Sequence, residues 1–254
     1  MNALTVYSKD ELAILENLDL MPAGMDNLEA GDVGMPPRLR ISQPNRPVTI
    51  GGEEVTPGNI VNTMSGESWD SVAIVPIVFL PRTRVMWPKE YNADNAPECV
   101  SNDGKLPDLT RADVTNPQPG PCATCPMASF PEGGGKPRCS EQRNFLVWLV
   151  DAGEPAILTL QSTAIKEARH LTALAKTTGL KKAVKMTTVK VKDSRGSWFV
   201  PQFSRGDALP IESIVALAEA RDELRNLVIG ADTEATSGSG NVHFEEDDLN
   251  EMPF

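Results

Sequence analysis

The chain alternates between β-type and helical patterns of apolar residues. After residue 36, charged and apolar side chains alternate at 38–42, and a long β-branched run follows at 72–80. Pro76 interrupts that run, which indicates a bulge or an edge position because proline cannot donate a ladder hydrogen bond. This part of the chain is therefore expected to form strands at 38–42, 58–63, 72–80 and 81–88.

The second half of the chain adds helices to the β pattern. A helix is predicted over 163–176, capped by Ser162 or Thr163 and ended by Gly179. The other expected elements are two strands around a turn at 145–150 and 156–160, a hairpin at 184–192 and 197–203, and a helix at about 211–227.

This order of elements favours a mainly β fold with helices. Several strands, a helix and a closing hairpin fit an OB-fold-like β-barrel, the five-stranded oligonucleotide-binding barrel with a helix between strands three and four. Other barrels and α+β sheets also fit, since periodicity alone does not separate them.

Composition divides the chain into three parts. Residues 1–35 form an acidic N-terminal arm with a weak helical pattern at 8–20. Residues 36–230 form the OB-like domain, interrupted at about 91–140 by a Pro/Gly-rich insertion without periodicity. Residues 231–254 form a flexible linker and a disordered acidic C-terminal tail.

Charge is segregated along the chain, whose formal net charge is −11. Residues 1–35 hold seven acids and one base, and 231–254 hold seven acids and no base. Residues 162–206 hold ten bases and two acids. A locally basic body between two acidic ends is compatible with a nucleic-acid partner despite the overall charge.

The chain has no run approaching 18 apolar residues and no basic-then-apolar start. We therefore expect no membrane partner, no secretory signal and a cytoplasmic location. In that reducing compartment, cysteines bind metal more often than they form disulfides.

All four cysteines lie in the insertion, as Cys99, Cys122, Cys125 and Cys139. The Cys-x-x-Cys pair places two thiolates on one metal, and the outer two complete a tetrahedral set. We expect structural Zn²⁺, which would organise a segment that has no apolar core. A redox role for the Cys-x-x-Cys pair is the alternative.

The cysteine region also resembles a known insertion. The segments 97–104, 122–126 and 136–140, including Cys-Ala-Thr-Cys-Pro and Lys-Pro-Arg-Cys-Ser, are similar to a zinc-binding insertion of phage-encoded proteins. The resemblance covers roughly residues 95–165. It implies a role in phage DNA replication or recombination, in the cytoplasm of a bacterial host.

The end of the chain resembles the tail of single-stranded DNA-binding proteins, an acidic run followed by Pro-Phe. That resemblance implies docking of replication, recombination or repair proteins. A solubilising tail is the alternative interpretation. The partner-binding residues expected here are Asp247, Asp248, Glu251, Met252, Pro253 and Phe254.

Binding of single strands without sequence preference needs a basic groove with aromatic platforms. Bases and aromatics lie close together in the expected strands. The candidate DNA-binding residues are Arg82, Arg84, Trp87, Lys181, Lys182, Lys185, Lys190, Lys192, Arg195, Trp198, Phe199 and Phe203. Trp87 and Trp198 fit the core equally well, whereas Phe79, Phe145 and Trp148 are expected to be core residues.

No motif indicates an enzyme. Gly133-Gly134-Gly135-Lys136 lacks the rest of a P-loop, and no catalytic Ser-His-Asp or Cys-His pairing is present. We therefore expect a phage-type single-stranded DNA-binding protein that recruits partners through its tail. The alternatives are a zinc-stabilised adaptor or transcription-modulating factor without strand binding, and a nuclease or recombination accessory enzyme.

Overall fold

The structure is a computed structural model that describes residues 36–88, 96–132, 135–193 and 196–234. These residues belong to one unit of the chain, Met35–Phe254. The helix predicted at 8–20 and the acidic tail lie outside the described residues. No described helix is long and apolar enough to cross a membrane.

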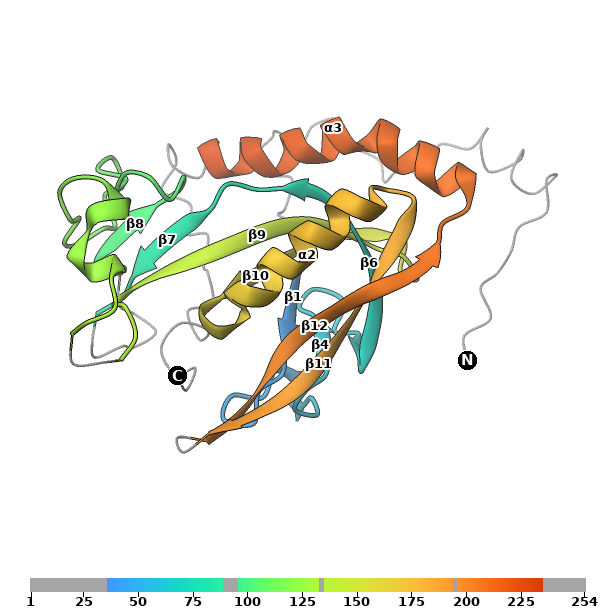
Figure 1. The fold of residues 1–254 in the computed structure, drawn as a ribbon, viewed down its shortest axis with the longest axis horizontal. Helices are drawn as coiled ribbons and strands as arrows, with labels where there is room; N and C mark the ends of the chain where they lie inside the picture. Colours follow the sequence, from blue (N-terminus) through green and yellow to red (C-terminus); the bar gives the residue numbers. More distant parts are fainter. Residues whose placement is uncertain (1–35, 89–95, 133–134, 194–195, 235–254) are drawn as a thin grey trace. The chain divides into compact units, whose positions relative to one another are not determined.

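Strands dominate the described part of the chain, as the sequence predicts (Figure 1). The strands are β1 (Arg38–Ile41), β2 (Thr49–Ile50), β3 (Glu53–Glu54), β4 (Ile60–Asn62), β5 (Ser68–Trp69), β6 (Ser71–Phe79), β7 (Thr83–Met86), β8 (Cys99–Ser101), β9 (Cys139–Leu149), β10 (Glu154–Gln161), β11 (Lys182–Asp193) and β12 (Gly196–Ala208). The helices are α2 (Ile165–Thr178) and α3 (Ile211–Glu234), with the short 3-10 turns η3 (Cys122–Thr124), η4 (Pro126–Ala128) and η5 (Ser162–Ala164).

The main sheet has the strand order β12-β11-β6-β9-β10-β1-β4-β5, and β7 and β8 join it beside β9. β1 runs parallel to β10, and the other paired strands are antiparallel. The ladder between β6 and β9 shifts register between Pro76 and Val78, which confirms the bulge predicted at Pro76. β2 and β3 form a separate small hairpin.

Strand β9 begins much earlier than the sequence predicts. Its first residues, 139–144, precede the strand expected at 145–150, and the first two of them fall in the insertion expected at about 91–140. They pair with β7 on one side and with β10 on the other. The run Ser-Glu-Gln-Arg-Asn has no apolar alternation, so its strand character comes from these two neighbouring ladders. As a result, β9 reaches from the core into the cysteine region.

The sheet packs against a different helix on each face. On one face, Phe145, Val147 and Leu149 of β9 join a buried cluster with Ala168 and Leu171 of α2. On the other face, the alternate residues of β9 and its neighbours form a second cluster that includes Leu217 of α3. The period-2 alternation of β9 thus supplies both cores.

The start of α2 differs from the sequence prediction. The helix begins after the 3-10 turn η5, and Ala164 occupies the N-cap position without a side-chain hydrogen bond. Ser162, one of the two predicted caps, has a φ of +49°. Gly179 ends the helix as predicted, and its N–H donates to the carbonyl of Ala175.

Of the three aromatic residues expected in the core, two pack there and one does not. Phe145 is buried, and Trp148 packs half-buried against the α3-side cluster. Phe79 is 48% exposed, so its assignment to the core was wrong. It lies at the last position of β6, beyond the part of the strand that β11 covers, and meets Phe145 edge-on at 5.4 Å between ring centroids.

The sheet curls until β12, at one end of the strand order, lies beside β1. The side chain of Gln43, just after β1, holds the backbone of Phe199 on β12 by two hydrogen bonds. Its Nε2 donates to the Phe199 carbonyl at 3.0 Å, and its Oε1 accepts from the Phe199 N–H at 2.8 Å. The hydroxyl of Thr188 on β11 donates to the carbonyl of Gly58 at 2.6 Å. These contacts tie the β11–β12 hairpin to the chain around β1 and β4.

The Phe199 ring rests directly on Gly58. A Cβ at Gly58 would lie 2.7 Å from Cε1 of that ring, and the residue has a φ of +98°. We expect Gly58→Ala to lower the free energy of unfolding by about 2–4 kcal/mol, because backbone strain and overpacking add. Denaturant unfolding measures the change.

Gly153→Ala is the matched control for this prediction. Gly153 has a φ of +70° but nothing within 4 Å of the added Cβ. It should cost only the backbone strain, about 1–2 kcal/mol. Equal losses for the two variants would contradict the contact between Gly58 and Phe199.

Candidate nucleic-acid interface and metal centre

The β11–β12 hairpin carries most of the predicted basic residues. β6 pairs with β11 only between Thr187 and Val184, so the part of the hairpin beyond Thr187 has no third strand on that side. Lys190 and Lys192 are exposed on this outer part, which we call the ribbon, residues 188–193 and 196–201. Lys181, Lys182 and Lys185 are exposed at the other end of β11. Arg195 lies outside the described residues.

Three predicted stacking residues lie on β12 in different surroundings. Phe203 is 2% exposed in the core cluster beneath α2, and Trp198 is 5% exposed. Neither ring offers a face to a base, because each is covered in the folded chain. Phe199 is half-buried, with Gly58 against its ring and the Lys190 ammonium 6.0 Å from the ring centroid.

The predicted residues on β7 lie apart from the ribbon. Arg82 is exposed just before the strand, and Trp87 just after it is half-buried. Arg84 is held in an ion pair, with 2.9 Å between its Nη2 and the Oε2 of Glu141 on β9. Glu141 also binds Arg143 at 2.5 Å, so one carboxylate fixes two guanidinium groups. This cluster therefore carries less free positive charge than the sequence indicates.

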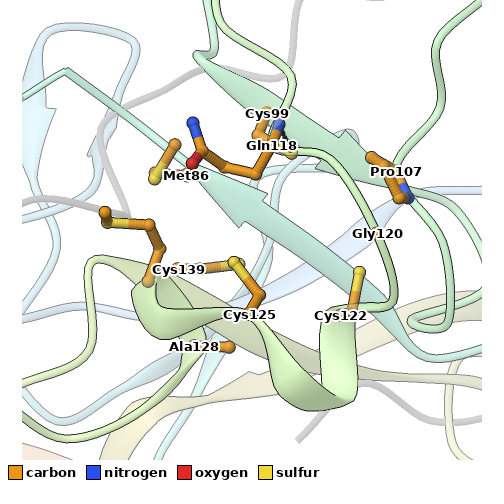
Figure 2. A pocket seen from close by; sticks show the side chains of 10 residues that line it. Met86, Cys99, Pro107, Gln118, Gly120, Cys122, Cys125, Ala128 and Cys139 are labelled. Atoms are coloured by element: carbon orange, nitrogen blue, oxygen red, sulfur yellow. Dashed lines mark hydrogen bonds between the residues drawn. The ribbon is translucent and has the colours of Figure 1, made fainter.

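The four cysteines line one small pocket (Figure 2). They come from four separate places: β8, the turn η3, the residue between η3 and η4, and the first residue of β9. Met86, Met127 and Ala128 contribute apolar surface to the same pocket. All four cysteines are free thiols, and three are buried while Cys125 is half-buried. The structure thus brings the four cysteines to the same pocket.

Burial raises the pKa of the Cys139 thiol to about 11; the Arg84 guanidinium opposes this rise, and the nearby sulfurs of Cys99 and Cys122 add to it. Burial also raises the pKa of Cys99, while a backbone N–H, from Gln118 at 3.5 Å, favours its thiolate. The sulfurs oppose one another's ionisation because they surround one small volume, and a cation among them would reverse that effect.

The donor set fits zinc in type and number, since four sulfurs converge on one closed pocket. In the described residues, however, the side chains do not group three or more Cys, His, Asp or Glu closely enough to hold a metal ion. The pocket therefore brings together the donors that zinc prefers, although the described side chains do not form a metal-binding group.

A chain of neutral polar side chains crosses β7, β9 and β10, and sequence reasoning missed it. We call it the polar ladder. The Thr159 hydroxyl donates to Asn144 Oδ1 at 2.9 Å, and Asn144 Nδ2 donates to the Thr83 hydroxyl at 3.1 Å. That hydroxyl donates to Gln142 Oε1 at 3.0 Å, and Gln142 Nε2 donates to Gln161 Oε1 at 3.1 Å.

The polar ladder lies on the α3-facing side of the sheet, next to the second core cluster. Its members pair directly across the strands, so their side chains share one face. The sequence signal was the spacing of Gln142 and Asn144, two residues apart. It was missed because no strand was predicted before residue 145.

The family described as Pam3 phage gp34-like protein matches residues 9–227. The chain belongs to this family. Neither the curated proteins nor the solved structures contain a significant match. Membership agrees with the phage resemblance of the cysteine region, and the family description assigns no activity.

Proposed function

We propose that the chain binds single-stranded DNA non-specifically through an oligonucleotide-binding barrel. Strand connectivity supports this proposal. β6 pairs with β9, β9 with β10, β6 also with β11, and β11 with β12, while α2 joins β10 to β11. This is the arrangement of five strands with a helix between the third and the fourth. β1 adds a strand parallel to β10 on the side where β12 approaches.

The connectivity also selects a binding face. In oligonucleotide-binding barrels, the ligand crosses strands two and three between the first loop and the last. Here these strands correspond to β9 and β10. The first loop corresponds to 80–138, which holds the cysteine pocket, and the last to the tip of the ribbon. The observation that supports this face is the place of the two features singled out in the sequence. The cysteine pocket takes Cys139 from β9, and β12 approaches β1, the neighbour of β10.

Charge distribution supports phosphate contacts at the ribbon. In the cysteine region, Arg111 pairs with Asp113 at 2.5 Å and Arg138 pairs with Glu98 at 2.8 Å. Within the described residues, no acid pairs with the exposed lysines of β11. Exposed ammonium groups that are not neutralised attract phosphates over a Debye length.

Zinc in the cysteine pocket would fix the first loop against β9. The residues that would hold it are Cys99, Cys122, Cys125 and Cys139. Bonds from these sulfurs to the metal would stabilise an insertion that has little apolar core of its own. The acidic tail would remain available to recruit replication or recombination proteins. Its residues lie outside the described part of the chain.

Lys190→Ala combined with Lys192→Ala tests the ribbon. We expect weaker binding of labelled oligo(dT), measured by anisotropy. The slope of log affinity against log salt should fall by about 1.4, because each lost phosphate contact contributes about 0.7 on single strands.

Lys166→Ala combined with Lys176→Ala removes two exposed lysines from α2 and is the matched control. It should leave affinity and slope nearly unchanged. If the wild-type protein ignores oligo(dT) at low salt, the proposal fails. Tail-dependent capture of a protein partner by that same preparation would instead favour an adaptor.

Metal content tests the zinc proposal. The purified protein should hold one zinc ion per chain, and Cys122→Ser should reduce that content by at least about tenfold. Ala123→Ser, at an exposed position in the same turn, should keep the metal. Chelation should make residues 97–138 sensitive to proteases. A metal-free wild-type protein with an equally resistant insertion would contradict the proposal.

A further inference from the structure

The polar ladder presents two fixed amides on the proposed binding face. Gln142 and Asn144 are two residues apart on β9, half-buried, on the same side of the sheet. Neither is charged, so they add nothing to phosphate attraction. Each side-chain amide donates one hydrogen bond and accepts one, and its two partners lie on β7 and β10. Among the described residues, no further hydrogen bond engages either side-chain amide.

The ladder leaves each of the two amides with unused hydrogen-bonding groups. A primary amide has two N–H donors and two oxygen lone pairs. Side chains on the two neighbouring strands occupy one N–H and one lone pair of each amide. The second N–H and the second lone pair of each amide have no partner among the described residues. Gln142 and Asn144 are held with opposite polarity, because Gln142 accepts from Thr83 while Asn144 donates to it.

We infer that Gln142 and Asn144 bind the Watson–Crick edges of unpaired bases. An adjacent donor and acceptor form a bidentate pair with a base edge that also offers one of each. All four bases have such a pair on the Watson–Crick edge, and a duplex conceals it. The two amides therefore select single strands over duplex without selecting sequence. This inference rests on the proposed function and specifies which groups of the DNA the binding face contacts.

The spacing of the amides fits an extended strand. Two residues along a β-strand span about 7 Å. Stacked bases in DNA rise about 3.4 Å each. Two consecutive bases reach both amides only when the strand is unstacked and stretched across β9. Phosphates on the same strand would then lie toward the ribbon lysines.

Chemically altered thymine provides the sharpest test. N3-methylthymidine lacks the N3–H donor but keeps the charge, the sugar and a stackable ring. Wild-type protein should bind oligo(dT) roughly tenfold more tightly than the N3-methylated oligomer of the same length, measured by anisotropy at one salt concentration. Gln142→Ala combined with Asn144→Ala should bring that ratio close to one. Gln202→Ala, at an exposed position on β12, should keep it.

A second variant acts without removing either amide. Thr159→Val removes the hydroxyl that holds Asn144 Oδ1. It should reduce the ratio partly while leaving affinity for the methylated oligomer unchanged. The wild-type ratio decides the matter even if the double variant does not fold. Equal wild-type binding of both oligomers overturns the inference and leaves strand binding intact. Binding of neither oligomer overturns the proposed function and this inference with it.

Discussion

Strand β9 is the constraint on which the rest of the structure depends. It hydrogen-bonds to β7 and then β6 along one edge and to β10 along the other. One end of β9 supplies Cys139 to the cysteine pocket, and the other end supplies buried residues to both cores. A strand paired along both edges cannot shift by one residue without turning every side chain to the opposite face. The pocket, the polar ladder and the two cores are therefore fixed relative to one another.

Charged and neutral polar side chains occupy different regions of the sheet. In the cysteine region, ion pairs neutralise arginines locally, and Glu141 holds two more on β7 and β9. On β11, exposed lysines stand without acidic partners among the described residues. Between these two regions, the polar ladder uses only neutral groups. Under the proposed function, the ribbon would attract the polyanion, while the face between ribbon and pocket would discriminate by hydrogen bonding at little electrostatic cost.

The sequence predicted those elements whose apolar pattern is strong. The bulge at Pro76, the helix ended by Gly179 and the long hairpin follow from local rules on proline, glycine and alternation. It missed the first half of β9 because residues 139–144 become a strand only through their pairing with β7 and β10. The polar ladder was missed for the same reason, because the spacing of two amides indicates a shared face only when the segment is known to be a strand.

The aromatic assignments failed for a related reason. Phe79 is exposed at the last position of β6, and Phe203 is buried because its cross-strand partner Met186 belongs to the core beneath α2. Both outcomes depend on register between distant strands, which a single sequence does not reveal. The gathering of the cysteines was predictable because metal ligands must converge whatever the fold around them.

We propose that an unpaired strand crosses β9 and β10 between the cysteine pocket and the ribbon. Photocross-linking of oligonucleotides carrying 5-iodouracil, with the attached residues identified by mass spectrometry, tests it most directly. Cross-links are expected on β9, β10 and the ribbon. Cross-links confined to α2, or to β2 and β3, would contradict it.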